Sequence, residues 1–343
     1  MGNCTLARRN FVFFLLPEFS MMAFTSAVDL LRIANRATGI DMYSWTLVSR
    51  DGQPVAASTD VRIEVDRDLK SMQRDTLGGE APDIAFVCGG LRVENYCYPD
   101  LKDWLRSLAK RKRGVGGLCT GAWVLADAGL MDGRNGTIHW ENIPGFSEHF
   151  PEANVAPHLC EIDGDIYTSA GGTASLDLVL HIIGQDFDEE TVARVCEMSL
   201  VDRMRDIHDR QRLPLGARVG HHDSKLLSVV QLMESNLSEP LSLEDISHKV
   251  GLSRRHVERL FRLYLGRSPA RYYLEIRLDR ARQLLRQTSL PVIEIAIACG
   301  FVSASHFSKC YREAYGCSPQ SERAKPAGAQ QKRAARQVSA TAP

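Results

Sequence analysis

The 343-residue sequence lacks any apolar stretch approaching the roughly 20 residues that a membrane-spanning helix requires. Its first apolar run, residues 11–16, follows Arg8 and Arg9 but stops at Pro17, and no small-x-small cleavage motif comes after it. A secretory signal is therefore not indicated, and the run is better explained as a buried first strand. We expect a cytoplasmic protein without a membrane partner.

The sequence also lacks cysteine pairs at metal-binding or redox spacing. It has nine cysteines, an odd number, and none forms a CxxC motif: Cys4, Cys88, Cys97, Cys119, Cys160, Cys196, Cys299, Cys310 and Cys317. A disulfide framework and a cysteine-ligated zinc site are not indicated. Reduced thiols in the cytosol fit this pattern better, and we expect neither a metal nor a cofactor.

The sequence also lacks a net charge, because its 42 basic and 42 acidic residues cancel. The cancellation hides a division along the chain. Residues 218–343 hold 20 basic and 11 acidic side chains, a net charge of +9, and residues 1–217 carry the opposite −9. A basic region joined to an acidic one indicates a polyanionic partner for the basic part.

The N-terminal region alternates short apolar runs with helical patterns. The runs at residues 11–16, 45–49, 84–88 and 115–119 predict strands, and helices are predicted over 21–35, 98–111, 121–128, 174–184 and 189–198. Strands that are apolar throughout and separated by helices indicate an α/β domain, whose parallel sheet is covered by helices on both faces. Such sheets bind ligands beyond the carboxyl ends of their strands.

The remaining chain divides by composition. Residues 1–202 form the predicted α/β domain, and the polar segment 203–223, with Pro214 and Gly216, is the predicted linker. The pattern over 224–320 is all helical. Residues 321–343 are rich in Ala, Gln, Lys, Arg and Ser without an apolar period, which predicts a disordered tail.

The all-helical region contains an internal duplication. Ile246, Val250 and Gly251 match Ile295, Cys299 and Gly300, which lie 49 residues later, and after a one-residue insertion a longer set matches at a spacing of 50. That set pairs Ser253 with Ser303, His256 with His306, Val257 with Phe307, Arg259 with Lys309, Phe261 with Tyr311, Arg262 with Arg312, Gly266 with Gly316, Ser268 with Ser318 and Pro269 with Pro319.

Each copy has the layout of a helix-turn-helix (HTH) unit. A short helix ends at a glycine, and Ser253 or Ser303 is placed to cap the next helix. The second helix has apolar residues at i, i+3 and i+4: Val257, Leu260 and Phe261, or Phe307, Cys310 and Tyr311. Between the copies, residues 270–287 predict one helix about 27 Å long. Such a spacer suits two recognition helices in successive major grooves, about 34 Å apart.

Residues 226–320 resemble the DNA-binding domain of the AraC/XylS family, and the run from Gly300 to Pro319 is close to that family's C-terminal signature. The resemblance implies sequence-specific binding to double-stranded DNA, activation of transcription and contact with RNA polymerase. It assigns base reading to Arg254, Arg255, Glu258 and Arg259 in the first unit, and to Ala304, Ser305, His306 and Lys309 in the second. Ala304 offers a base only apolar contact.

The α/β domain places Cys119 at a sharp turn between a strand and a helix, with His139 twenty residues on. A nucleophile elbow exposes its side chain, and a helix N-terminus lowers the pKa of a thiol. Cysteine with histidine is the minimum for thiol catalysis. The alternative is a packed cysteine with an unrelated histidine.

Residues 10–200 resemble the DJ-1/PfpI branch of the class I glutamine amidotransferase-like fold, including the spacing of Cys119 and His139. The order of the two domains resembles the GlxA family of regulators. Ala23 stands where the DJ-1 branch has a glutamate, with Glu18 as the nearby substitute, and Thr120 stands where PfpI-type proteases have a histidine. These departures favour a sensor, not an enzyme. The alternative is a thiol-dependent amidase or hydrolase fused to a DNA-binding domain.

The predicted sensor site lies at the turns that follow the strands. Its residues are Phe19, Gly89, Gly90, Cys119, Thr120, His139 and Trp140. The resemblance implies a nitrogenous effector, such as an amino acid or a quaternary amine, and we expect the regulator to be a homodimer. Trp123, Trp140, Phe19 and Phe24 form either an aromatic cage for a cationic nitrogen, worth up to about 2 kcal/mol, or part of the core.

Overall fold

The computed structural model describes residues 8–212, 216–217, 220, 223–288 and 290–324. The chain forms two compact units that meet between Gln211 and Arg212. In the described part of the chain, no helix is long and apolar enough to cross a membrane.

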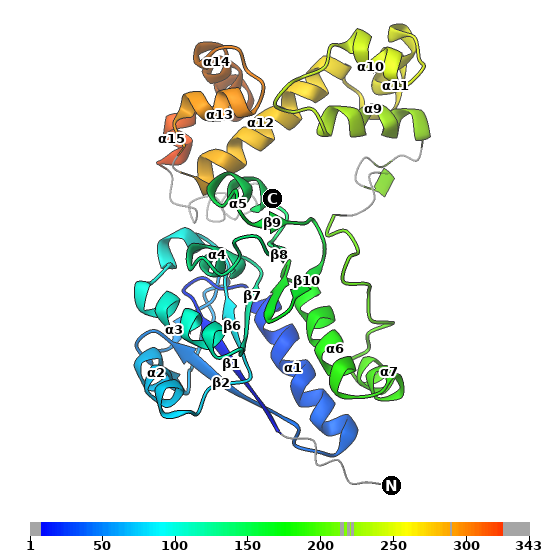
Figure 1. The fold of residues 1–343 in the computed structure, drawn as a ribbon. Coiled ribbons are helices and arrows are strands. Elements are labelled where there is room, and N and C mark those ends of the chain that lie inside the picture. The colour runs from blue at the N-terminus through cyan, green and yellow to red at the C-terminus, as the bar shows by residue number, and fades with distance from the viewer. Residues whose placement is uncertain (1–7, 213–215, 218–219, 221–222, 289, 325–343) are drawn as a thin grey trace, which may run out of the picture. The chain divides into compact units, whose positions relative to one another are not determined.

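The first unit is built on a seven-stranded sheet in the order β10-β11-β7-β6-β1-β2-β5 (Figure 1). All neighbouring strands are parallel except β10 and β11, which form an antiparallel pair at one edge. The strands are β1 (Arg9–Leu15), β2 (Tyr43–Ser49), β5 (Arg67–Asp68), β6 (Ile84–Cys88), β7 (Gly114–Leu118), β10 (Cys160–Asp163) and β11 (Ile166–Ser169). Four short strands lie outside this sheet and pair in twos: β3 (Val55–Ala56) with β4 (Arg62–Ile63), and β8 (Asn135–Gly136) with β9 (Asn154–Val155).

Helices cover both faces of this sheet, so the predicted fold class is confirmed (Figure 1). One face packs against α1 (Met21–Thr38), α6 (Ala174–Asp186) and α7 (Glu189–Met198). The other packs against α2 (Leu69–Gly78), η1 (Val93–Tyr96), α3 (Pro99–Lys110), α4 (Ala122–Asp127) and α5 (Ile143–His149). In β1, Phe11 and Phe13 point to the first layer, whereas Val12 and Phe14 point to the second, because side chains alternate along a strand.

The four central strands and five helices predicted from periodicity are all present, with ends shifted by at most a few residues. The β10–β11 hairpin was not predicted from the sequence. Both strands have only four residues, and β10 (Cys160–Asp163) mixes charged with apolar side chains because it is the edge strand of the sheet.

The segment 203–211, which the sequence assigned to the linker, is attached to the first unit. Backbone amides of Leu159 and Cys160 donate to the carbonyls of Asp209 and Ile207 at 2.8 and 2.9 Å, so the segment lies along the end of β10. Arg205 donates to the buried carboxylate of Asp177 at 2.5–3.0 Å. The chain therefore leaves the first unit at Gln211, later than the composition indicated. Pro214 lies outside the described residues.

The second unit is all helical, as predicted. Its helices are α9 (Ser224–Glu234), α10 (Leu243–Lys249), α11 (Arg254–Leu265), α12 (Pro269–Gln287), α13 (Val292–Ala298), α14 (Ala304–Tyr315) and α15 (Pro319–Arg323). Two small cores lie along α12, one around Ile246 and Phe261 and the other around Ile295 and Tyr311. Figure 1 shows the two helix groups at opposite ends of α12.

The folded part of the second unit extends past the predicted start of the tail at residue 321. Glu322 in α15 is only 2% exposed, and its carboxylate accepts hydrogen bonds from Arg282, at 3.1 Å, and from Arg286, at 2.9 Å. These two ion pairs hold α15 against the end of α12. Residues 325–343 lie outside the described part of the chain.

Candidate DNA interface and ligand site

The two predicted recognition helices are α11 and α14, and both begin at the predicted capping serine. Ser253 accepts a hydrogen bond from the amide of His256, and Ser303 from that of His306, each at 3.2 Å. Both helices end at a glycine with positive φ, Gly266 at 65° and Gly316 at 70°. The predicted apolar triplets are the buried residues of the two helices, so the packing inferred from the duplication is confirmed.

The polar faces of α11 and α14 point to solvent. Arg254, Arg255 and Arg259 are exposed, and Glu258 is half-buried and paired with Arg254 at 3.1 Å. On α14, Ser305, His306 and Lys309 are exposed and Ala304 is half-buried. The structure therefore brings the four base-reading candidates of each copy onto one short helical surface. This is the geometry that a helix needs to present side chains to a major groove.

Part of the positive charge of the second unit maintains its fold and is not free for a partner. Arg267 and Arg271 both bind the carboxylate of Glu275, and Arg282 and Arg286 share Glu322. In contrast, Arg255 and Lys309 have no ion-pair partner among the described residues. The charge count alone did not separate these two roles.

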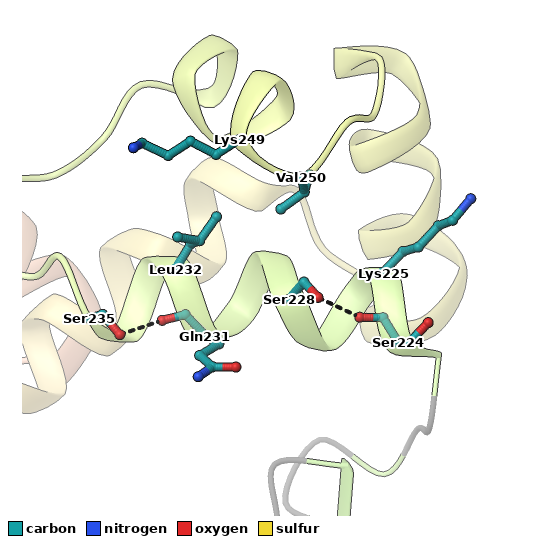
Figure 2. A pocket seen from close by; sticks show the side chains of 8 residues that line it. All are labelled: Ser224, Lys225, Ser228, Gln231, Leu232, Ser235, Lys249 and Val250. Carbon is teal, nitrogen blue, oxygen red and sulfur yellow. Dashed lines mark hydrogen bonds between the residues drawn. The ribbon is translucent and has the colours of Figure 1, made fainter.

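A groove of about 400 Å³ runs between α9 and the end of α10 (Figure 2). Two of its hydroxyl groups are bonded within α9, since Ser228 donates to the carbonyl of Ser224 and Ser235 to that of Gln231, both at 2.9 Å. The lining also contains Lys225 and Lys249. The groove is thus cationic.

In the first unit, Cys119 follows β7 at the turn into α4, with a left-handed φ of 60°. A Cβ atom at Gly171 would lie 2.9 Å from its sulfur, so a larger residue there would collide with Cys119. Thr120 donates its hydroxyl to the carbonyl of Gly90 at 2.8 Å, which ties this turn to the turn after β6. The predicted elbow is present, but the Cys119 residue is only 9% exposed.

Of the two alternatives for this thiol, the structure favours a packed cysteine over an activated one. Burial, with a smaller contribution from the Glu141 carboxylate, raises the pKa of Cys119 to about 11, although hydrogen bonds from the Thr120 amide and from Ser20 act in the opposite direction. Desolvation disfavours the thiolate more than the helix N-terminus stabilises it. Cys119 is therefore a protonated thiol at neutral pH.

His139 does not form a dyad with Cys119, and the described residues contain no hydrogen bond between the two. Burial lowers the pKa of His139, and its Nδ1 atom accepts a hydrogen bond from the amide of Glu141 at 3.4 Å. The ring of Trp140 lies beside it, with centroids 5.8 Å apart. Glu141 acts electrostatically on both Cys119 and His139, so these residues share one region.

Glu18 does not replace the missing acid of the DJ-1 branch. It receives a hydrogen bond from Arg92 Nε at 2.6 Å and one from the Tyr96 hydroxyl at 3.2 Å, and it does not contribute to the pKa of Cys119. Glu18, Arg92 and Cys119 all have positive φ, at 61°, 53° and 60°, just after β1, β6 and β7. Such strain in non-glycine residues gathers at functional sites. The sequence offered no signal for Arg92 or Tyr96.

The other predicted ligand residues mainly build the turns. The amide of Gly89 donates to Leu118 at 3.1 Å, and its carbonyl accepts from Ser20 at 2.9 Å. A Cβ atom at Gly90 would lie 2.0 Å from the carbonyl oxygen of Glu18, so only glycine fits there. Phe19 is fully buried and contacts Phe24 edge to face, with ring centroids 5.5 Å apart.

The four aromatic residues of the candidate cage do not come together. Phe19 and Phe24 lie in the core layer of α1, whereas Trp123 lies in the opposite layer, against Phe146. Trp140 is the half-buried one, next to His139. The reading as core aromatics holds for Phe19, Phe24 and Trp123.

Comparison with known proteins agrees with both units. Residues 9–185 match the DJ-1/PfpI family, and residues 246–325 match a helix-turn-helix domain family. The HTH-type transcriptional regulator GbdR of Pseudomonas aeruginosa is 43% identical over 311 residues, 91% of this chain and 83% of the relative. GlxA of Rhizobium meliloti, also an HTH-type transcriptional regulator, is 34% identical over 91% of this chain and 94% of its own.

A crystal structure of an AraC family transcriptional regulator from Pseudomonas putida is 28% identical, with a TM-score of 0.50, and covers 56% of this chain and 99% of that one. Its fold is similar to part of this chain, and the relatives match nearly all of it. The protein is a DNA-binding transcription regulator, and it belongs to the family that joins a DJ-1/PfpI domain to an AraC-type helix-turn-helix domain.

Proposed function

We propose that this protein is a sequence-specific activator of transcription that responds to a small nitrogenous metabolite bound by its first unit. The observation that carries the DNA part is the pair of capped, exposed recognition helices at the two ends of α12. With 19 residues, α12 is about 28 Å long, which suits two successive major grooves. Arg255, Arg259, His306 and Lys309 then read bases, and Lys225 and Lys249 in the groove beside α9 contact phosphates.

The effector site lies at the carboxyl ends of β1, β6 and β7, around Cys119, Thr120, His139 and Trp140. The support for a cationic nitrogen is the combination of Trp140 with the Glu141 carboxylate, which is close enough to raise the pKa of Cys119. An aromatic face and a carboxylate are the two groups that recognise an ammonium ion. Phe19, Gly89 and Gly90 shape the turn beneath them.

Two observations argue against the alternative of a thiol-dependent amidase. The pKa of Cys119 is raised to about 11, and His139 is hydrogen-bonded to the Glu141 amide, away from a dyad. A thiol nucleophile needs the opposite, a lowered pKa or an adjacent base. We infer that Cys119 packs the floor of the sensor site.

Effector binding can change DNA binding only if the two states of the protein bind the effector with different affinity. We infer that the active state is a homodimer assembled through the first unit, which places its DNA-binding units on adjacent sites and contacts RNA polymerase. This arrangement explains how a site remote in sequence from α11 and α14 controls them.

The test is selection of binding sites from random duplex DNA, followed by transcription with purified RNA polymerase. We expect one enriched sequence with half-sites about 10 bp apart, and stimulation by an amino acid or amine. Glu141→Gln and Trp140→Ala should abolish the response without affecting DNA affinity, whereas the exposed Glu148→Gln should keep it. Selection that enriches no sequence would disprove the DNA part, and a response only to neutral sugars or to carboxylates would disprove the effector class.

A further inference from the structure

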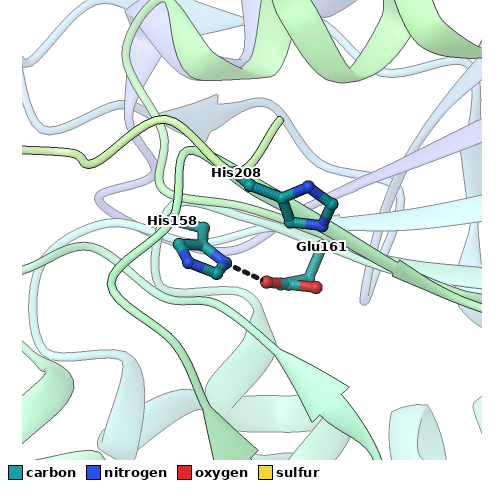
Figure 3. Close-up of side chains that lie close together, drawn as sticks. All are labelled: His158, Glu161 and His208. Atoms are coloured by element: carbon teal, nitrogen blue, oxygen red, sulfur yellow. Dashed lines mark hydrogen bonds and ion pairs between the residues drawn. The ribbon is translucent and has the colours of Figure 1, made fainter. Parts of the chain in front are cut away.

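Two histidines and a glutamate converge at the edge of the sheet in the first unit (Figure 3). His158 precedes β10, Glu161 lies in β10, and His208 comes from the segment 203–211. One ligand atom of each residue lies within 4.8 Å of the others. The Nδ1 atom of His158 contacts the Glu161 carboxylate directly, and the rings of His158 and His208 are 5.2 Å apart, edge to face.

The three side chains differ in exposure in a way that suits a bound ion. The Glu161 side chain is only 10% exposed, that of His158 is 32% exposed, and that of His208 is 59% exposed. A buried carboxylate thus lies beside two imidazoles that are accessible to solvent. Asp206 lies 3.5 Å from Nδ1 of His208, where an outer carboxylate orients a metal-binding ring.

The backbone holds these side chains in place without a metal. The segment 207–211 pairs with residues 157–160 through the Leu159–Asp209 and Cys160–Ile207 hydrogen bonds. Gln211 adds three hydrogen bonds, to Thr137 at 2.8 Å, to the carbonyl of Ile138 at 2.9 Å and to that of His158 at 2.8 Å. The hydrogen-bonded segment 207–211 therefore places His208 beside His158 and Glu161.

We propose that His158, Glu161 and His208 bind a zinc ion that fastens the last segment of the first unit to its sheet. Two imidazoles and one carboxylate suit zinc and similar divalent transition metals, whereas magnesium and calcium prefer oxygen ligands alone. Around tetrahedral zinc the ligand atoms are about 3.3 Å apart. The cluster must therefore contract from its present spacing for zinc to bind, and His208, whose side chain is 59% exposed, has room to turn toward the other two ligands; water fills the fourth position.

Zinc at this site would act on the segment that connects the two units. Residues 203–211 are the last ones of the first unit before the chain enters the DNA-binding unit. Two zinc ligands lie at β10 and the third lies in this segment. Bound zinc therefore stabilises, by mass action, the state in which the segment is attached to β10. The metal thereby controls how firmly the start of the connection is held.

Zinc affinity is measured on the full-length protein after removal of metals, by competition with a chromophoric chelator. We expect one zinc ion per chain at this site. His158→Ala, His208→Ala and Glu161→Gln should each weaken binding at least about tenfold, the size of effect that even outer partners of a metal have. His248→Ala, at an exposed histidine of α10, is the matched control and should bind zinc as the parent does.

Protection of the segment provides a second measurement. Zinc, but not magnesium, should slow tryptic cleavage at Arg203, Arg205 and Arg210, and His208→Ala should remove the protection. With a chelator present, His208→Ala and the parent should unfold at the same temperature. If His208 had only a structural role, the variant would unfold at a lower temperature even without zinc. Equal zinc affinity of the parent and His208→Ala would overturn the proposal, and so would loss of zinc binding in the double variant His221→Ala, His222→Ala instead.

Discussion

The guanidinium of Arg277 donates a hydrogen bond to the carbonyl of Gly300 at 2.6 Å, and a second one to that of Cys299 at 2.7 Å. It also lies 4.3 Å from the centre of the Phe301 ring. Arg277 belongs to α12, and the two carbonyls end α13. A single side chain of the connecting helix therefore caps the first helix of the second HTH unit, where a cation is favoured by the helix dipole.

Removal of this cap should loosen the second HTH unit alone. Arg277→Ala leaves two carbonyls without their donor, which costs about 1–3 kcal/mol of stability. Part of this cost is offset, because the variant no longer buries a charged group, and burial lowers the pKa of Arg277. We expect faster amide hydrogen exchange in α13 and α14, with α10 and α11 unchanged. Arg271→Ala, in an exposed ion pair of the same helix, is the control. Equal effects in both HTH units would contradict the cap.

The duplicated glycines provide a matched pair of substitutions. Gly251 and Gly300 both have left-handed φ, at 66° and 72°, which costs alanine about 1–2 kcal/mol at either site. A Cβ atom at Gly251 meets nothing within 4 Å, whereas one at Gly300 would lie 2.5 Å from Pro240. Gly300→Ala should therefore destabilise its HTH unit by about 1–3 kcal/mol more than Gly251→Ala. Hydrogen exchange of the two units measures both, and equal losses would show that Pro240 yields.

The recognition helices should contribute through individual arginines. Arg255→Ala or Arg259→Ala should weaken operator binding by about 1–3 kcal/mol and relax the preference at one base pair. The charge-matched control is Arg32→Ala, an exposed residue of α1, which should leave the affinity unchanged. The measurement is titration of the selected operator and of single-base variants at constant salt. Full affinity in the double variant Arg255→Ala, His306→Ala would contradict base reading by both HTH units.

The buried thiol makes a prediction about pH. Because the pKa of Cys119 is raised to about 11, its alkylation should be slow at pH 7 and rise about tenfold per pH unit up to that value. A free cysteine derivative levels off near its pKa of about 8.5. Peptide mapping by mass spectrometry isolates Cys119 from the other thiols. An alkylation rate that levels off below pH 8 would instead support a reactive thiol.

The same residue separates the sensor from the enzyme by function. Cys119→Ser has nearly the same volume and should keep most of the effector-dependent activation in a reporter assay, because the thiol packs the site and does not react. Alongside it, Gly171→Ala should lose the response, since its Cβ atom would lie 2.9 Å from the sulfur. The enzyme alternative wins if Cys119→Ser removes both a measurable turnover and activation.

The two units should also be separable. A piece comprising residues 212–343 should bind the operator without any response to effector, because the proposed effector site is in the other unit. The piece 1–211 should carry most of the self-association. Sedimentation of both pieces, and DNA titrations with and without effector, test this division. A C-terminal piece that still responds would place the sensor in the wrong unit.

The local features of this fold could be predicted from the sequence because they depend on neighbours within one or two turns. The caps at Ser253 and Ser303, the buried triplets of α11 and α14, and strand β6 repeat short-range patterns that the backbone geometry dictates. The internal duplication strengthened these signals, since the same pattern occurred twice.

Only the tertiary structure decided which distant residues meet. The two layers on opposite faces of the sheet separated Phe19 from Trp123, although each residue comes shortly after a strand. Sheet order brought Arg92 to Glu18, 74 residues away in sequence, and attached His208 to His158 and Glu161 at the edge. The pKa of Cys119 followed from its burial, which a strand-to-helix turn in the sequence does not reveal. Periodicity in the sequence indicates which face of a helix or strand is buried, but the packing of the layers determines which residues that face contacts. The chemistry of a site depends on those contacts.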